Sequence, residues 1–235
     1  MDVIPVIDVR HGVAVAAVRG DRAAYRPLTT PLADGSDPIG VAKGYARLFN
    51  FAVLYVADLD AIEGRGANAA LPEGLASAIP GIALWVDAGL RPREAAEMLA
   101  VSDAATPVIG TESLAADSDI ADLEALPRDR FVLSLDFKGD QFIGPPRIFD
   151  TPELWPDRLI VMTLARVGSG EGPDLTRIAD IIARANGRRV YAAGGVRNRA
   201  DIEALHKAGA AGVLVATALH AGKIKAGDLD EIAGL

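Results

Sequence analysis

The sequence contains no cysteine, and only 5% of its residues are aromatic. Without cysteine the chain can form neither disulfide bonds nor thiolate zinc sites, which is compatible with a reducing compartment. Its 24 basic residues are scattered and are outnumbered by 32 acidic residues, for a net charge of −8. Because nucleic acids bind clustered lysine and arginine, we expect no nucleic-acid partner.

Long hydrophobic runs are also missing. The N-terminal segment Met1–Asp8 has acids on both sides of a short apolar run, which is typical of neither a signal peptide nor a membrane span. We therefore expect a cytoplasmic protein with no membrane partner. The pattern of residues does not predict an oligomeric state.

A chain of 235 residues, half of them hydrophobic, can bury one large core, so we expect a single domain over residues 1–235. Short apolar runs end in polar or glycine-rich turns, and amphipathic stretches such as 92–99 and 199–208 lie between most of them. Strands that alternate with helices pair in parallel, and eight of them favour a closed barrel. The predicted fold is an α/β (βα)8 TIM barrel with strands at 3–7, 52–57, 82–86, 107–109, 131–135, 159–162, 189–192 and 212–215.

The segment from residue 10 to residue 37 is the one long interval between expected strand ends. It contains His11-Gly12 and Arg19-Gly20-Asp21-Arg22. Long loops after barrel strands are usually functional lids, and the alternative is a floppy insertion.

An internal repeat supports the barrel. Residues 87–99 align without gaps to residues 193–205, at the constant offset of 106 that separates Asp87 from Ala193. The same offset pairs Gly110-Thr111 with Ala216-Thr217, so the third and fourth strands look like copies of the seventh and eighth. We expect a two-fold repeat of half-barrels.

The half-barrel repeat, Ile-Pro-Val-Ile-Asp ending at Asp8, Asp-Leu-Asp after the second strand and Ser-Leu-Asp ending at Asp136 together resemble the HisA/HisF family over nearly the whole chain. HisA is ProFAR isomerase, which performs an Amadori rearrangement of a phosphorylated aminoaldose in histidine biosynthesis. HisF is the neighbouring cyclase. The segments Tyr25-Arg-Pro and Trp85-Val-Asp-Ala-Gly look closer to HisA/HisF-related proteins of methanogens and methylotrophs, which are linked to one-carbon metabolism.

The resemblance implies that Asp8 is a catalytic base, that Asp136 is a catalytic acid, and that Thr163 lies near the reacting centre. On this view burial raises the pKa of Asp136 while Asp8 stays ionised. The alternative for each aspartate is a helix cap or an ion pair with a lysine such as Lys138. Thr163 could instead satisfy a backbone group at its strand end.

Phosphate groups bind where glycines let backbone N–H groups approach at helix N-termini. This predicts a phosphate site after the last three strands, formed by Gly168, Gly194, Gly195, Ala216 and Thr217. The matching site in the first half would use Gly89, Gly110 and Thr111.

Asp87 stands in that first-half site, and a carboxylate repels a phosphate dianion. We therefore expect this side of the barrel to meet a neutral or cationic group, with an Asp87–Arg91 ion pair as the alternative. Asp58, His11 and Arg19 are further positions that could set specificity. Asp58 and Asp60 match no dedicated metal spacing, so no metal and no cofactor are expected, and the other two histidines are expected to be exposed on helices.

Three hypotheses follow from these residues. The first is an aldose–ketose isomerase that acts on ProFAR or a related phosphorylated aminoaldose without a cofactor. The second keeps the aspartates but assigns them to a lyase, condensation or isomerase step in making a one-carbon carrier of the tetrahydromethanopterin or methanofuran type. The third is an inactive binding subunit, because a fold by itself guarantees no activity.

Overall fold

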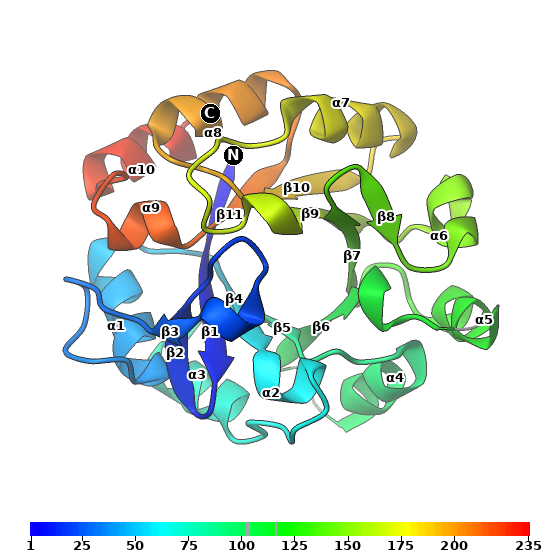
Figure 1. The fold of residues 1–235 in the computed structure, drawn as a ribbon, viewed down its shortest axis with the longest axis horizontal. Coiled ribbons are helices and arrows are strands. Elements are labelled where there is room, and N and C mark those ends of the chain that lie inside the picture. The colour runs from blue at the N-terminus through cyan, green and yellow to red at the C-terminus, as the bar shows by residue number, and fades with distance from the viewer. Residues whose placement is uncertain (102–103, 116) are drawn as a thin grey trace.

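The computed structural model describes residues 1–101, 104–115 and 117–235 (Figure 1). Within these residues eight parallel strands form a closed barrel, because the last of them pairs with the first through Asp2–Gly212 to Pro5–Val215. The barrel strands are β1 (Asp2–Arg10), β4 (Val53–Asp58), β5 (Ala83–Asp87), β6 (Ala105–Gly110), β7 (Val132–Lys138), β9 (Arg158–Thr163), β10 (Arg189–Ala193) and β11 (Gly212–Val215). The predicted (βα)8 barrel is confirmed.

Alternating residues of each strand face opposite sides of the barrel wall. On β7, Leu133 and Leu135 pack outward against the helices, whereas Val132 packs inside the barrel. The interior holds one cluster of side chains from all eight strands, and the outer layer holds a second, larger cluster. This alternation decides which strand-end residues can reach the barrel interior.

Helices surround the barrel on its outer side (Figure 1). Several begin at a side chain that accepts a hydrogen bond from the first helical turn, such as Asp37, Asp174 and Asn198. The α-helices are α1 (Pro38–Leu48), α2 (Leu59–Ile62), α3 (Leu71–Ala78), α4 (Pro92–Val101), α5 (Asp117–Ala125), α6 (Pro146–Asp150), α7 (Leu175–Arg184), α8 (Arg199–Lys207), α9 (Thr217–His220) and α10 (Ala226–Ala233). The 3-10 turns are η1 (Arg22–Ala24), η2 (Thr111–Ser113), η3 (Pro152–Leu154) and η4 (Leu164–Arg166).

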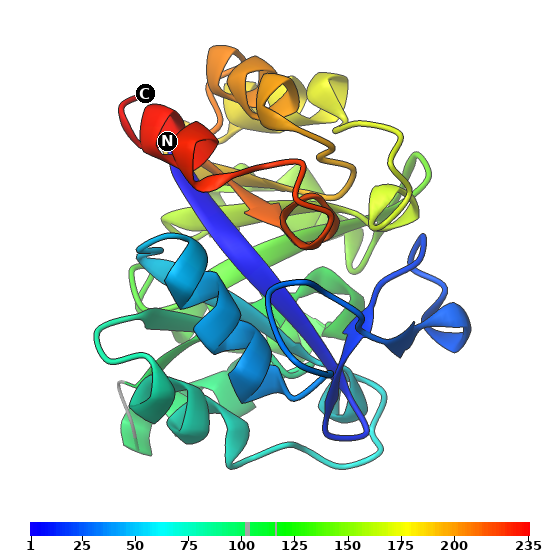
Figure 2. The same cartoon turned by 90° about the vertical axis from the view of Figure 1, so that its left-hand side faces the viewer.

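The segment between β1 and α1 is ordered by pairing, so the alternative of a floppy insertion is wrong. The strand β2 (Val13–Ala16) pairs antiparallel with β1, and the short strand β3 (Arg26–Pro27) pairs with β2. Its tip contacts the loop after β9, where the Arg19 N–H donates to the Val167 carbonyl at 2.6 Å. Figure 2 shows this segment extending beyond one end of the barrel.

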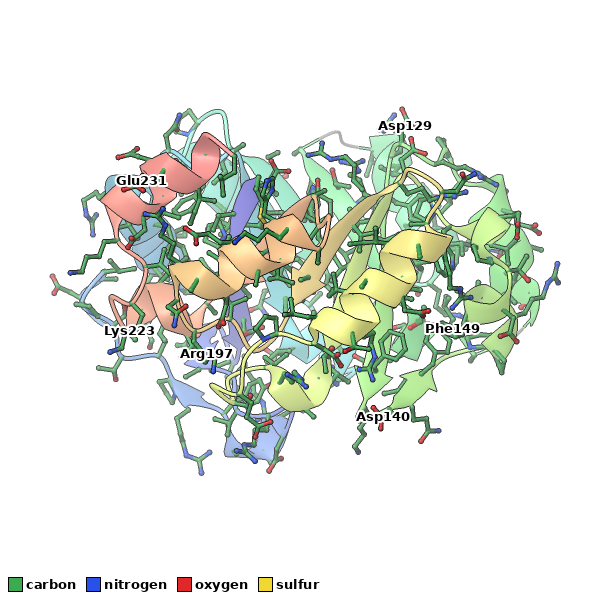
Figure 3. All side chains as sticks on the ribbon, turned by 90° about the horizontal axis from the view of Figure 1, so that it is seen from above. Asp129, Asp140, Phe149, Arg197, Lys223 and Glu231 are labelled. Atoms are coloured by element: carbon green, nitrogen blue, oxygen red, sulfur yellow. The ribbon has the colours of Figure 1, made fainter. Side chains whose placement is uncertain are left out.

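That end is the one where the parallel strands finish. Figure 3 shows Arg197 and Lys223 there, while Asp129 and Glu231 lie at the opposite end. A further short strand, β8 (Gln141–Ile143), forms a hairpin with β7 at the same end as Arg197. None of the helices in the described ranges is long and apolar enough to span a membrane.

The expectation that His220 is exposed is wrong. Its ring lies between the Tyr45 hydroxyl, 2.7 Å from Nε2, and the Thr30 hydroxyl, 3.0 Å from Nδ1. Tyr45 donates to the Val6 carbonyl at 2.9 Å, so its oxygen accepts from Nε2–H and Nδ1 accepts from Thr30. The ring therefore joins α9 to α1 and to the segment before α1, and burial lowers its pKa to about 4.

Candidate active site

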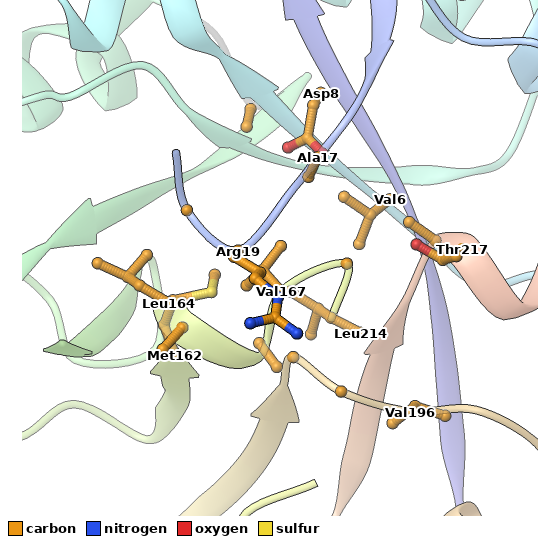
Figure 4. A pocket seen from close by; sticks show the side chains of 18 of the residues that line it. Val6, Asp8, Ala17, Arg19, Met162, Leu164, Val167, Val196, Leu214 and Thr217 are labelled. Carbon is orange, nitrogen blue, oxygen red and sulfur yellow. The ribbon is translucent and has the colours of Figure 1, made fainter. Parts of the chain in front are cut away.

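A cavity of about 950 Å³ opens at the carboxyl end of the barrel strands. Its wall includes residues of β1, β4, β5, β7, β9, β10 and β11, and the segment between β2 and β3. Figure 4 shows Asp8, Arg19 and Thr217 on this lining. Active sites of (βα)8 enzymes occur at this end of the barrel, so the cavity is the candidate active site.

Two aspartates enter the cavity from opposite walls. Asp8 lies on β1 and Asp136 on β7, which are the first and fifth strands of the eight in the barrel order. Asp8 lies four residues after Ile4, and Asp136 lies four residues after Val132. Because side chains alternate along a strand, both aspartates face the barrel interior as Ile4 and Val132 do. The prediction that both aspartates lie at one site agrees with this geometry.

Asp136 is held firmly, with only 4% of its surface exposed. The Ser134 hydroxyl donates to Oδ1 at 2.6 Å, and the Glu112 N–H donates to Oδ2 at 3.1 Å. Burial nevertheless raises the pKa of Asp136 to about 7, since these donors only partly offset it. A carboxyl with such a pKa can give up or take a proton near neutral pH.

Asp8 has a comparable pKa, which corrects the expectation that it stays fully ionised. Burial raises the pKa of Asp8 to about 7, while the Arg22 guanidinium opposes the increase. The surroundings of the two aspartates differ in one respect. The Arg22 cation lowers the pKa of Asp8 while the Asp87 carboxylate raises it, whereas the nearby carboxylates of Glu112 and Asp87 both raise the pKa of Asp136.

Asp87 is a third carboxylate in the cavity, at the end of β5. The Tyr55 hydroxyl donates to Oδ2 at 2.9 Å, and the Gly89 N–H donates to Oδ1 at 3.1 Å. The alternative Asp87–Arg91 ion pair is wrong, because Arg91 binds Asp119 through Nε and Nη2 at 3.0 and 2.6 Å. Burial raises the pKa of Asp87 to about 6, while the donors Gly89 and Tyr55 oppose the increase.

Glycines lie in the opposite wall after β9 and β10, and Ala216 and Thr217 follow β11 there. Gly194 and Gly195 have φ angles of 103° and 85°, which L side chains rarely adopt. A Cβ on Gly195 would lie 2.2 Å from the Gly172 carbonyl oxygen, so only glycine lets these two loops approach. Of the predicted phosphate residues, Gly168, Gly194, Gly195, Ala216 and Thr217 all line the cavity.

The predicted phosphate residues of the first half are placed differently. Thr111 is fully buried, and its hydroxyl accepts from the Asp136 N–H at 3.0 Å. Gly110 leaves room for the Asp136 carboxylate, since a Cβ there would lie 3.1 Å from Oδ2. The Gly89 N–H is bound to Asp87. In the structure these three residues contact the carboxylate-bearing residues Asp87 and Asp136.

Thr163 is also placed differently from the prediction. Only 5% of its surface is exposed, and it follows Leu159 and Val161 in the outward phase of β9. Its neighbour Met162 lines the cavity instead. The structure therefore does not support a direct role for the Thr163 side chain beside the two aspartates.

Asp58 and His11 lie outside the cavity wall. Asp58 caps α2 through the Ala61 N–H at 3.2 Å and also accepts from the Asn68 N–H at 2.6 Å. His11, on the exposed turn between β1 and β2, donates its N–H to Asp60 at 2.6 Å. Arg19 does line the cavity and pairs with Glu171 at 3.0 Å. Within the described ranges no group of three or more acidic or histidine side chains could hold a metal ion.

Several lining residues were not predicted from the sequence. Arg22 in η1 binds Glu112 at 2.6 Å, which joins the segment after β2 to the turn after β6. Tyr55 and Lys138 lie in the inward phases of β4 and β7. Tyr55 lies two residues before Ala57, and Lys138 lies two residues after Asp136. Residues two apart on a strand share a face, so this spacing could have identified them. Pairing between Arg22 and Glu112 left no such signal, because 90 residues separate them.

Comparisons with known proteins agree with this architecture. The model of the family described as histidine biosynthesis protein matches residues 2–225. An uncharacterized protein of Methanocaldococcus jannaschii is 32% identical, over 99% of this chain and 97% of its own length. Phosphoribosyl isomerase A of Streptomyces coelicolor is 30% identical, over 94% of this chain and 93% of its own.

An imidazole-4-carboxamide isomerase of Myxococcus xanthus is 30% identical over 96% of both chains, and its name specifies two phosphoribosyl groups. The match thus extends along the whole barrel, including both half-barrels and the strands that carry Asp8 and Asp136. This chain belongs to the histidine biosynthesis protein family.

Proposed function

We propose that the protein is an aldose–ketose isomerase that performs an Amadori-type rearrangement of a phosphorylated aminoaldose. The observation that carries the proposal is the pair Asp8 and Asp136, which face one cavity from opposite strands beside a glycine-rich wall. The relatives named as isomerases match the same two half-barrels. No step of this reaction needs a cofactor, because it moves protons within one substrate.

The reaction needs an acid and a base at the same time. The acid protonates the ring oxygen of the aminoaldose, so that the ring opens to an iminium ion. The base then removes the proton from the adjacent carbon, and the resulting enamine becomes the aminoketose. Two carboxyl groups with pKa values near 7 suit both roles at neutral pH.

The surroundings of the two carboxyl groups favour one assignment. Arg22 stabilises the ionised form of Asp8, which suits a base. The nearby carboxylates of Glu112 and Asp87 favour the protonated form of Asp136, which suits an acid. We therefore assign Asp8 as the base and Asp136 as the acid.

Phosphate is proposed to bind at the wall formed by Gly194, Gly195 and Thr217. This wall combines glycines that allow close backbone approach with the start of α8 at Asn198. Arg197 and Lys223 also line the cavity on this side. A phosphate there would hold the sugar across the cavity between Asp8 and Asp136.

The test measures isomerisation by the purified protein of ProFAR, which carries two phosphoribosyl groups, and of aminoaldoses that carry a single phosphate. Asp8→Asn and Asp136→Asn should each lower kcat about 10²–10⁴-fold. Asp37→Asn is the matched control, because it makes the same change at a helix cap outside the cavity and should keep the wild-type rate. Equal rates for the wild type and both active-site variants would refute the proposed roles.

A second candidate function is favoured by Asp87, a carboxylate where a second phosphate would have to bind. In that case the same aspartates would act in a lyase, condensation or isomerase step that makes a one-carbon carrier. Folded protein that binds inorganic phosphate but converts neither ProFAR nor an aminoaldose with a single phosphate would support this candidate. Failure to bind any phosphorylated ligand would favour an inactive binding subunit.

A further inference from the structure

The two ends of the cavity differ in chemistry although they arise from repeated sequence. Asp87-Ala88-Gly89 after β5 corresponds to Ala193-Gly194-Gly195 after β10 at the offset of 106 residues. The β10 end presents glycines with no acidic side chain at the corresponding position. The β5 end replaces that small residue with a carboxylate inside the cavity.

Asp87 is fixed in an orientation that leaves it able to bind a ligand. One oxygen accepts from the buried Tyr55 hydroxyl and the other from the Gly89 N–H. A carboxylate has about four acceptor positions, so roughly two remain for a group in the cavity. With a pKa of about 6, Asp87 is mostly ionised at neutral pH.

The cations near this end do not convert it into an anion site. Arg22 is already bound to Glu112 at 2.6 Å. Lys138 lies one inward position beyond Asp136 on β7 and is exposed, so it reaches the rim of the cavity. The backbone N–H that a phosphate would need, that of Gly89, is bound to Asp87. A phosphate dianion would therefore meet a carboxylate at close range.

We propose that Asp87, held by Tyr55 and Gly89, is a specificity residue that receives a protonated amine at the β5 end of the cavity and excludes a phosphate. This inference rests on the proposed function and narrows its substrate class to phosphorylated amines with a single phosphate, bound at the β10–β11 end. It separates this chain from the relative whose name specifies two phosphoribosyl groups.

The test measures binding of three matched series by titration calorimetry at pH 7. The probes are aminoalkyl phosphates of increasing length, the alkyl phosphates of equal length and the corresponding alkane bisphosphates, with inorganic phosphate as reference. One aminoalkyl phosphate long enough to reach Asp87 should bind about ten-fold more tightly than its alkyl partner. The bisphosphates should bind no more tightly than the alkyl phosphates.

Asp87→Asn keeps the size of the side chain and removes its charge. It should abolish the preference for the amine and leave the affinity for inorganic phosphate unchanged. Asp140→Asn is the matched control, because Asp140 is exposed in the turn between β7 and β8 and the change in net charge is the same. This control should keep the preference for the amine.

The outcomes separate the two proposals. Tight binding of bisphosphates, or an amine preference that Asp87→Asn retains, would overturn the role of Asp87 while leaving the proposed function intact. If neither inorganic phosphate nor any compound of the three series binds, the proposed phosphate site at the β10–β11 end is wrong, and both proposals fail.

Discussion

At the scale of single residues, the cavity depends on how each carboxyl group is hydrogen-bonded. Asp136 accepts from a hydroxyl and a backbone N–H, Asp87 accepts from Tyr55 and Gly89, and Asp8 makes none of the side-chain hydrogen bonds that the structure describes. All three carboxyl groups have raised pKa values because burial disfavours the charged form. Removal of a hydrogen-bond donor to one of these carboxyl groups should therefore change the pH dependence of the reaction rate.

Ser134→Ala should shift one limb of the pH–rate profile. The Ser134 hydroxyl stabilises ionised Asp136, so its removal raises the pKa of Asp136 further, by about one unit or less. An acid must be protonated, so the alkaline limb of kcat should move to higher pH. The measurement is kcat between pH 5 and pH 9, with Ser77→Ala on the exposed face of α3 as control.

The same profile tests the assignment of roles. If Asp136 were the base, activity would require its ionised form, and the acid limb would move to higher pH instead. A shift of the acid limb would therefore exchange the roles of Asp136 and Asp8. No shift of either limb would mean that Asp136 does not titrate in the rate-limiting step.

At the scale of elements, the loops that follow β9 and β10 are built around close backbone contact. The Gly172 N–H donates to the Gly195 carbonyl at 3.1 Å, and Arg166 donates to the carbonyls of Gly172 and Pro173. The tip of the segment after β2 adds a further bond from Arg19 to Val167. These contacts position the glycine-rich wall before any ligand arrives.

Gly195→Ala should destabilise the fold more than Gly187→Ala. Both glycines have a similar φ, 85° and 82°, so the backbone strain is matched. At Gly195 the new Cβ would collide with a carbonyl oxygen 2.2 Å away, whereas at Gly187 no atom of the described residues lies within 4 Å. We expect an additional loss of roughly 1–3 kcal/mol in the free energy of unfolding, measured by urea denaturation. Equal losses would show that the loop moves aside at little cost.

At the scale of the whole molecule, the cavity lowers the stability of the fold at neutral and alkaline pH. In the unfolded chain Asp8 releases its proton near pH 3.8, whereas the folded chain holds it up to about pH 7. Between these values the folded state binds more protons, so stability falls as pH rises. Asp136 and Asp87 contribute in the same direction. A functional site that opposes folding stability is a common compromise.

Asp8→Asn should therefore stabilise the protein at alkaline pH. Asparagine cannot titrate, so the variant should gain roughly 1–3 kcal/mol over the wild type at pH 8 and little at pH 4. Comparison of the two proteins at equal pH cancels the contributions of other titratable groups to the free energy of unfolding. One of these groups is His220, whose lowered pKa makes stability rise with pH. Urea denaturation of both proteins at the two pH values gives the difference. A pH-independent difference would contradict a raised pKa in Asp8.

The barrel, the repeat of its halves and the strands that carry Asp8, Asp87 and Asp136 could be predicted from the amino-acid sequence alone. These features depend on local periodicity, because hydrophobic runs define strands and a strand end in a parallel barrel always reaches the same face. The predicted strand at 212–215 agrees with β11, and the other strands differ by one to three residues at their ends.

Which residues of the barrel strands share the cavity depends on contacts that form only in the folded chain. Asp58 and Thr163 are the last residues of β4 and β9 and point away from the barrel interior, whereas Asp8 near the end of β1 points into it. Tertiary contacts also placed Arg22 against Glu112 and Tyr55 against Asp87. The pKa values of the aspartates followed from burial in the closed barrel. Such effects depend on which groups meet in space and on how much water they lose, and neither is encoded in residue spacing.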